Sequence, residues 1–252
     1  MIHIRYISDI HLEFIESNKI NNLIKQIKQI EKDEICVLAG DIGNPYKEHY
    51  KIFMDHISKT FNKTFVICGN HEYYNNKKTI EETNDYLINY FKQYSNITFL
   101  NNSFELYNNY MFIGTTLWSN ITNPEYEIND VYKIKNLNYI KYNELNRNCK
   151  LYLDEQIKTN DNIIMITHHM PSYSLIDEKY KVINMNKYNQ WFYSDMDKFI
   201  EENKDKIKCW IYGHTHMPNF KLLHDIPFMC NPIGYPNENS KLDFDKTFIL
   251  IF

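Results

Sequence analysis

The sequence is poor in glycine and contains no run of Gly, Ser and Pro that would mark a linker between domains. Only 6 of the 252 residues are glycine, against 21 tyrosines. No internal repeat is present either. These absences favour a single domain spanning residues 1–252, a length that can bury a substantial core.

Cysteine is present in an odd number, five, and without C-x-x-C spacing. Three of the five, Cys36, Cys68 and Cys209, lie inside apolar runs, where cysteine usually behaves as a small core residue. This usage excludes a disulfide framework and suits a reducing compartment.

Long hydrophobic runs are missing as well. No apolar segment approaches the ~18 residues that a membrane span requires. The first ten residues include His3, Arg5 and Asp9, so they do not resemble the apolar core of a signal peptide. We therefore expect a cytoplasmic protein without membrane contact.

The chain also lacks an excess of positive charge. It has 28 Lys and Arg against 32 Asp and Glu, which gives a net charge of -4. Such a chain has no global basic field that would draw it onto nucleic acid. Any attraction for an anion must therefore be local.

Five short runs rich in β-branched and aromatic residues share one layout, because each ends at a polar residue able to bind a metal. They are IHIRYIS before Asp9, EICVLAG before Asp41, TFVICG before Asn70 and His71, NIIMIT before His168 and His169, and KCWIYG before His214. Their composition is typical of buried strands. The first three motifs lie about 30 residues apart, the size of a βαβ unit. Parallel strands are therefore expected to gather these loops at one edge, where α/β proteins bind ligands.

The remaining segments are expected to be helices, strands and covering loops. Helices are predicted over 18–32, 46–60, 78–94, 144–159 and 188–203, and short strands over 97–118, 217–233 and 246–252. The segments 120–145 and 171–187 are expected to lie over the site.

Seven side chains at the predicted edge offer nitrogen or oxygen ligands and none offers sulfur: Asp9, His11, Asp41, Asn70, His168, His214 and His216. Such ligands suit manganese, iron, zinc, cobalt or nickel, with manganese expected in vitro. Seven ligands are too many for one ion that must also keep a position open for substrate, so we expect two divalent ions that share one carboxylate. In an extended turn, residues two apart point to the same side, so His214 and His216 could each reach a different ion.

The motifs resemble those of the calcineurin-like metallophosphoesterase superfamily. They are D-x-H (Asp9, His11), G-D (Gly40, Asp41), G-N-H-E (Gly69 to Glu72), H-H-x-P (His168 to Pro171) and G-H-T-H (Gly213 to His216), in the family's order. SDIHLEF, GNHEYY, GTTLW and NPIGYP further resemble a branch of small bacterial and viral members. The resemblance implies an α/β fold, a four-layer α/β/β/α sandwich of two mixed β-sheets flanked by helices.

The resemblance also implies a role for each motif residue. Asp9, His11 and His216 would hold the first metal, Asn70, His168 and His214 the second, and Asp41 would bridge the two. His71 would donate a proton to the leaving group, and Asn70, His71 and His169 would contact substrate. His169 could instead support the ligands. Glu72 could orient His71 by accepting its other N–H or simply begin a helix.

The implied reaction is hydrolysis of a phosphomonoester or phosphodiester by a hydroxide that bridges the metals. Four metal charges, minus two carboxylates and one hydroxide, leave about +1 at the centre, which would attract a phosphate. The run GDIGNPY lacks the Arg of protein serine/threonine phosphatases, which favours a small-molecule phosphoester over a protein substrate.

Two alternatives stay open. A catalytically silent scaffold of this fold would lose ligands, which this chain retains. A nucleic-acid-processing phosphodiesterase would need a locally basic strip between 173 and 190, since the overall charge does not support a nucleic-acid partner.

Overall fold

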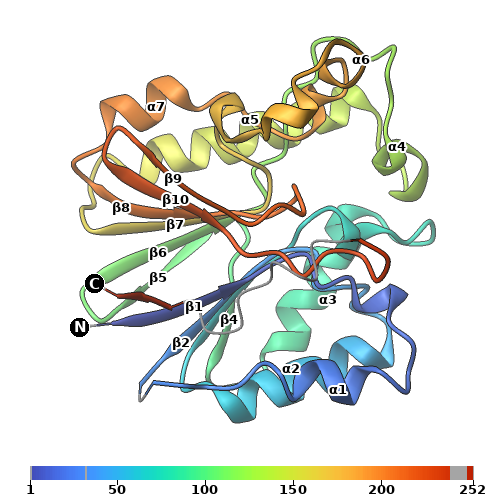
Figure 1. The fold of residues 1–252 in the computed structure, drawn as a ribbon, viewed down its shortest axis with the longest axis vertical. Coiled ribbons are helices and arrows are strands. Elements are labelled where there is room, and N and C mark those ends of the chain that lie inside the picture. Colours follow the sequence, from blue (N-terminus) through green and yellow to red (C-terminus); the bar gives the residue numbers. More distant parts are fainter. Residues whose placement is uncertain (1, 32, 239–248, 252) are drawn as a thin grey trace.

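Two β-sheets pack face to face between two layers of helices (Figure 1). The computed structural model describes residues 2–31, 33–238 and 249–251. Helices α1 to α3 cover the outer face of one sheet, and α5 and α7 cover the outer face of the other. The predicted four-layer α/β/β/α sandwich with two mixed sheets is confirmed.

The first sheet has five strands. In spatial order they are β11 (Ile249–Ile251), β1 (His3–Ile7), β2 (Ile35–Ala39), β3 (Thr64–Ile67) and β4 (Ile97–Phe99). The strands β1 to β4 are parallel, and β11 pairs antiparallel with β1. Of the strand predicted over 246–252, residues 246–248 and 252 lie outside the described residues.

The second sheet has six strands. In spatial order they are β5 (Ser103–Tyr107), β6 (Tyr110–Thr115), β7 (Ile163–Thr167), β8 (Ile207–Ile211), β10 (Ile226–Cys230) and β9 (Asn219–Leu223). The four central strands are parallel, and β5 and β9 close the edges antiparallel. Asn108 and Asn109 form the β5–β6 turn with φ of 50° and 66°, the backbone that a two-residue hairpin requires.

The five predicted helices are present in order with different bounds. The helices are α1 (Ile20–Ile24), α2 (Glu48–Thr60), α3 (Ile80–Phe91), α4 (Asn129–Lys133), α5 (Tyr139–Gln156), α6 (Ile183–Asn186) and α7 (Asp197–Glu202). Of these, α4 and α6, in the segments expected to cover the site, were not predicted as helices. Short 3-10 turns are η1 (Leu12–Phe14), η2 (His71–Tyr73), η3 (Tyr173–Leu175), η4 (Glu178–Tyr180) and η5 (Asn189–Trp191). Thr79 and Glu82 form a capping box that starts α3, which fixes the register of that helix. No helix in the described part of the chain is long and apolar enough to cross a bilayer.

The helices predicted over 18–32 and 188–203 are each shorter than expected. After Ile24 the backbone continues with bonds to the third residue back, and the carbonyl of Ile27 is bonded by His56 of α2 at 2.7 Å. A side chain from another element thus takes the place of the next helical turn. In the second segment only 197–202 is α-helical; residues 189–191 form η5, and Tyr193 between them pairs with Met170 in an isolated β-bridge.

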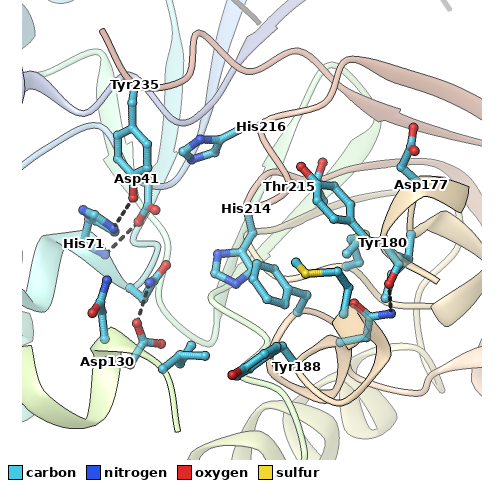
Figure 2. A pocket seen from close by; sticks show the side chains of 18 of the residues that line it. Asp41, His71, Asp130, Asp177, Tyr180, Tyr188, His214, Thr215, His216 and Tyr235 are labelled. Atoms are coloured by element: carbon cyan, nitrogen blue, oxygen red, sulfur yellow. Dashed lines mark hydrogen bonds between the residues drawn. The ribbon is translucent and has the colours of Figure 1, made fainter. Parts of the chain in front are cut away.

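The parallel strands of both sheets end on the same side of the molecule (Figure 1). The loops after β1, β2 and β3 meet those after β7 and β8 there, and a cavity lies between them (Figure 2). The two sheets together, rather than one sheet edge, therefore build the site.

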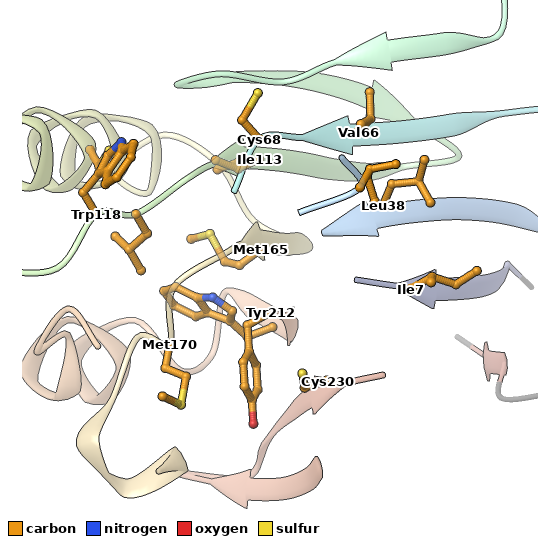
Figure 3. Packing of buried hydrophobic residues seen from close by; sticks show 14 of the residues in the cluster. Ile7, Leu38, Val66, Cys68, Ile113, Trp118, Met165, Met170, Tyr212 and Cys230 are labelled. Atoms are coloured by element: carbon orange, nitrogen blue, oxygen red, sulfur yellow. The ribbon is translucent and has the colours of Figure 1, made fainter. Parts of the chain in front are cut away.

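Successive side chains of a strand point to opposite faces of its sheet, so the buried residues form two clusters. Val37 and Ala39 of β2 lie between the sheets, while Leu38 joins Val66 and Ile113 in the cluster on the helix-facing sides (Figure 3). Phe65 and Phe112 stack across the sheets with ring centroids 4.2 Å apart. The five cysteines are buried free thiols; burial was predicted for Cys36, Cys68 and Cys209.

Replacing Phe112 with Ala should destabilise the fold by about 3–5 kcal/mol, because the fully buried ring leaves a cavity between the sheets. Urea unfolding measures the loss. Phe104→Ala on the neighbouring strand β5 is the control, since that ring is 44% exposed and should cost under ~1 kcal/mol. Equal losses in the two variants would contradict this description of the core.

Candidate metal centre

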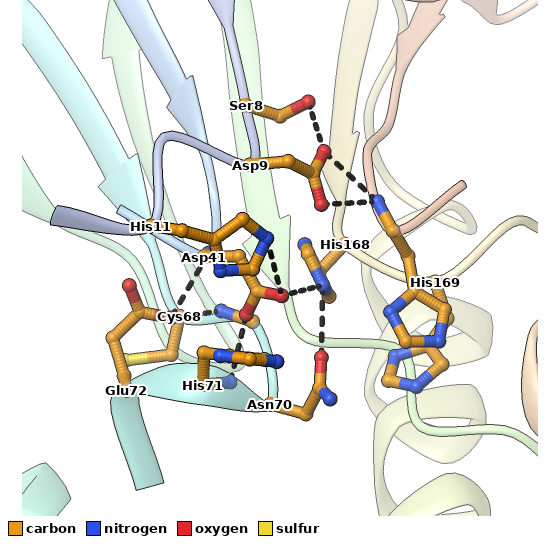
Figure 4. A network of polar contacts seen from close by, with 12 residues as sticks. Ser8, Asp9, His11, Asp41, Cys68, Asn70, His71, Glu72, His168 and His169 are labelled. Carbon is orange, nitrogen blue, oxygen red and sulfur yellow. Dashed lines mark hydrogen bonds and ion pairs between the residues drawn. The ribbon is translucent and has the colours of Figure 1, made fainter. Parts of the chain in front are cut away.

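The strand ends bring all seven predicted ligands together. Figure 4 shows five of them: Asp9, His11, Asp41, Asn70 and His168. The side chains come from the loops after β1, β2 and β3 in one sheet and after β7 and β8 in the other. Potential ligand atoms lie within 4.8 Å of one another in three groups: Asp9, His11 and His216; Asp41, His168 and His214; and His11, Asp41 and His71. Oδ1 of Asn70 lies 3.1 Å from Nε2 of His168. The first two groups contain six of the seven predicted ligands, and their binding of one ion each stays a prediction.

Five of the seven have left-handed backbone, which is uncommon for residues other than glycine. Their φ angles are 51° at Asp9, 52° at His11, 53° at Asp41, 74° at His214 and 50° at His216. The expectation of an extended turn at the last two is therefore wrong, although their side chains do reach different groups. Backbone held in such conformations is common at functional sites, because the surrounding structure must impose it.

Two glycines occupy positions at which any larger residue would collide with these ligands. A Cβ at Gly69 would overlap the Asp41 carboxylate and lie 2.6 Å from Cε1 of His168. A Cβ at Gly213 would lie 2.8 Å from Oδ2 of Asp9. The few glycines of this chain are thus concentrated where the loops approach the site most closely.

Asp41 lies between the two groups. Its Oδ1 accepts the backbone N–H of His71 at 2.7 Å. Its Oδ2 faces Nε2 of His168 at 3.2 Å and Nε2 of His11 at 3.9 Å. One carboxylate oxygen is therefore fixed by the backbone, and the other points to both groups.

Two of the imidazoles are held in the tautomer that a metal requires. Nδ1 of His168 donates to the carbonyl of Ala39 at 2.9 Å, and Nδ1 of His216 donates to Glu238 at 2.6 Å. In the neutral ring the Nε2 lone pair is then free. This is the usual arrangement behind metal-binding histidines.

The remaining polar atoms also fit divalent cations. Nε2 of His214 is buried and has no hydrogen-bond partner, although buried polar atoms are normally paired. Nε2 of His11 lies 2.8 Å from Nε2 of His216, whose proton is on the other nitrogen. Nitrogen, carboxylate and amide donors of this kind bind first-row divalent metals.

His71 belongs to a different arrangement. Its ligand atoms lie near His11 and Asp41, but both of its nitrogens already have partners. Nδ1 is 2.7 Å from Oε1 of Glu13, and Nε2 is 3.1 Å from the hydroxyl of Tyr235. His71 thus borders the cavity with its ring fixed at both ends.

The expectation that Glu72 orients His71 is wrong, because Glu13 occupies that position. The buried Glu72 carboxylate instead accepts the backbone N–H groups of Asp41, Ile42, Gly43 and Gly69. It therefore clamps the loops after β2 and β3 together. Glu13 follows His11 by two residues, and this spacing after the D-x-H motif is the only sequence signal that could have indicated it.

Asp130 was not predicted from the sequence. Its Oδ1 accepts Nδ2 of Asn70 at 2.8 Å, so Oδ1 of Asn70 is turned toward Nε2 of His168 at 3.1 Å. The hydroxyl of Tyr142 bonds Asp130 at 3.0 Å. Asp130 therefore sets the orientation of a predicted ligand.

His169 is fully buried and does not line the cavity. Its Nε2 lies 2.9 Å from the Tyr142 hydroxyl, and its Nδ1 lies 3.2 Å from the carbonyl of Thr116. Its ring packs 4.2 Å from that of His214. Of the two roles predicted for His169, this position favours support of the ligands over contact with substrate.

Charges at the centre are strongly coupled. Burial alone would raise the pKa of Asp41, but His168 and His71 hold it well below its usual range. Burial would lower the pKa of His168, yet the adjacent Asp41 raises it to about 10. Burial and the charge of His168 lower the pKa of His169 to about 3, so that ring is neutral.

The predicted charge count is incomplete. Burial opposes ionisation of Glu13 and Glu238, but contacts with His11 and His71 lower the pKa of Glu13, and contact with His216 lowers that of Glu238. Both carboxylates are therefore ionised beside the ligands. The predicted sum of about +1 covered the ligands alone. Burial would lower the pKa of His71, but Asp41 raises it to about 9, so the positive charge of His71 offsets one of the two added carboxylates.

The cavity beside the centre has a volume of about 330 Å³. Its walls come from the ligand loops and from the segments predicted to cover the site, including Ile128 and Asp130 of the first and Ile176 and Tyr180 of the second. Tyr235 of the NPIGYP segment also lines it, whereas Ile233 is buried outside it.

Comparison with known proteins identifies the family. The profile of the calcineurin-like phosphoesterases matches residues 2–218. The chain belongs to this family. It is 32% identical over 268 residues to uncharacterized protein L509 of Acanthamoeba polyphaga mimivirus, covering 95% of this chain and 94% of that protein.

Two solved structures share the fold of this calcineurin-like phosphoesterase. The phosphopantetheinyl hydrolase of Mycobacterium tuberculosis superimposes with a TM-score of 0.73 at 15% identity, over 94% of this chain and 93% of that one. The protein TT1561 of Thermus thermophilus has a TM-score of 0.60 at 13% identity, over 91% and 88% of the two chains. The family binds divalent metals, and the histidine and aspartate groups described above can hold them.

Replacing Glu72 with Gln should destabilise the protein by about 2–4 kcal/mol, because the amide nitrogen would face buried backbone N–H groups and leave them unpaired. Chemical unfolding measures this loss, and titration with manganese should show weaker binding. Glu125→Gln, at an exposed position, is the matched control. A change below ~0.5 kcal/mol would show that the clamp contributes little.

Proposed function

We propose that this phosphoesterase hydrolyses a small-molecule phosphoester with two divalent ions that share Asp41. The observation that carries the proposal is the position of the Asp41 Oδ2 atom, which faces His168 of one ligand group and His11 of the other. A single ion would need only one of these groups.

The residues divide into two sets by location. Asp9, His11 and His216 would hold one ion, Asn70, His168 and His214 the other, and Asp41 both. When bound, the ions would acidify a water molecule and neutralise the charge on the phosphoester oxygens. Manganese is the metal to test first.

His71 is proposed as the proton donor to the leaving oxygen. It lines the cavity beside Asp41 but is held by Glu13 and Tyr235 rather than pointing freely at the ligand groups. Glu13 would keep Nδ1 protonated, and the proton on Nε2 would then be the one delivered into the cavity. The hydroxyl of Tyr235, 3.1 Å away, would direct that atom.

The direct test is hydrolysis of para-nitrophenyl phosphate and of its bis-ester with added manganese, compared with the same assay in chelator. We expect turnover of at least one ester that disappears with chelator. Absence of turnover with manganese, iron, zinc, cobalt and nickel would support the scaffold alternative instead.

Replacing Asp41 with Asn should reduce the bound metal from two ions to none or one weakly held ion, because both groups lose a shared ligand. Metal analysis of the purified protein after manganese loading measures this. Asp154→Asn, an exposed change on α5, should keep the full content. Two tightly bound ions in the Asp41 variant would contradict a shared role.

Replacing His71 with Gln should lower kcat by about 10²–10⁴-fold, the usual contribution of general acid catalysis, while metal content stays unchanged. Steady-state kinetics and metal analysis of the same sample give both quantities. His224→Gln, exposed and remote from the cavity, is the control. Loss of metal together with activity would make His71 a ligand rather than a proton donor.

A further inference from the structure

The cavity at the metal centre has two unlike ends. Figure 2 shows Asp41, His71 and His216 at one end and Asp177 and Tyr180 at the other, with His214 and Tyr188 between them. The proposed reaction takes place at the first end. The residues of the second end do not take part in that reaction, but they determine which organic group of the substrate can bind there.

The rest of the cavity lining is mainly apolar and aromatic and includes Ile176, Met185, Tyr188 and Phe192, together with the polar Asp177 and Asn189. The Phe192 ring lies 4.7 Å from the ring of His214 at an angle of 35°, so the apolar wall begins directly beside a ligand. Apolar lining of this kind favours an apolar group by about 25 cal/mol for each Å² removed from water.

None of the described residues that line the cavity is a Lys or an Arg. The nearby Lys179 and Lys187 lie over the rings of Tyr180 and Tyr188 and do not line it. Asp177 and Glu238 do line it. A second phosphate or a carboxylate on the substrate would therefore meet acidic groups and no basic partner, which disfavours its burial.

The size of the cavity also favours a substrate with one phosphate. A volume of about 330 Å³ is at the lower end of the range for small-molecule sites. It can hold one phosphate and one compact organic group. An extended polyanion such as a nucleic-acid strand would need basic side chains along its path, and the lining offers none.

We infer that the preferred substrate is a phosphomonoester with a single anionic group, whose organic part is uncharged and apolar or aromatic and packs against Tyr188 and Phe192. This inference rests on the proposed hydrolase function. In the reaction, an oxygen of water bonds to phosphorus and releases one proton to solvent, the bond from phosphorus to the ester oxygen breaks, and His71 supplies a proton to that oxygen and regains one from solvent.

The experiment compares two esters of nearly the same leaving-group acidity in the manganese-loaded protein. They are 4-propylphenyl phosphate and 3-(4-phosphooxyphenyl)propanoate, which differ by a terminal methyl in place of a carboxylate. Because two methylenes separate that terminus from the ring, chemistry at phosphorus is matched. We expect kcat/KM to be at least about tenfold higher for the propyl ester.

Three variants locate the cause of the preference. Tyr188→Ala and Phe192→Ala should each raise KM for the propyl ester about tenfold, with the metal content retained. Asp177→Asn, which keeps a side-chain oxygen to cap η4, should raise kcat/KM for the carboxylate ester several-fold. Phe220→Ala is the control, because that ring is 56% exposed and outside the lining.

The outcomes separate the two proposals. Hydrolysis of neither ester with any metal would overturn the proposed function. Hydrolysis of both at equal rates, or faster hydrolysis of the carboxylate ester, would overturn only the inference about substrate. A preference that all three cavity variants leave unchanged would also overturn it, since the selecting residues would lie elsewhere.

Discussion

The structure depends on keeping the Asp41 carboxylate buried and ionised where the two sheets meet. A buried charge without partners is strongly unfavourable, and Asp41 is only 1% exposed. Its partners are a backbone N–H from the loop after β3 and imidazoles from the loops after β1 and β7. No single sheet could supply them, so the face-to-face packing of the sheets and the centre require each other.

This constraint also explains the chain's use of glycine and of strained backbone. Gly69 leaves room for the carboxylate and for His168, and Glu72 holds the two loops at that separation through their backbone N–H groups. The left-handed backbone at Asp9 and Asp41 then turns each carboxylate into the gap between sheets. Unfavourable local conformations persist because several independent contacts impose them.

The sequence predicted the residues that follow strands, because strands have a clear composition and their ends meet at one side of a parallel sheet. Asp9, Asp41 and His168 were found this way.

Glu13, Asp130 and Glu238 were missed, because they lie in a 3-10 turn, a five-residue helix and a loop, whose positions depend on tertiary contacts. Glu72 was noticed for its place in a motif, but its four backbone partners come from loops that only the fold brings together. Helix α1 ends early for a similar reason, a bond from His56 that the local pattern cannot show.

The missed carboxylates change how the site must work. Glu238 holds His216 in its metal-binding tautomer and Glu13 fixes His71, and orientation of imidazoles by carboxylates is common around metals. Each also adds a negative charge beside the proposed ligands, and the protonated His71 offsets one of these charges. With two ions bound, the positive field would be confined to the metal end of the cavity, with acidic and aromatic groups beyond it. Under the proposed function, one phosphate would be stabilised at that end, and binding of the rest of the substrate would come from apolar contact. The orientation of the ligands and the proposed restriction to a single anionic group would then have the same physical origin.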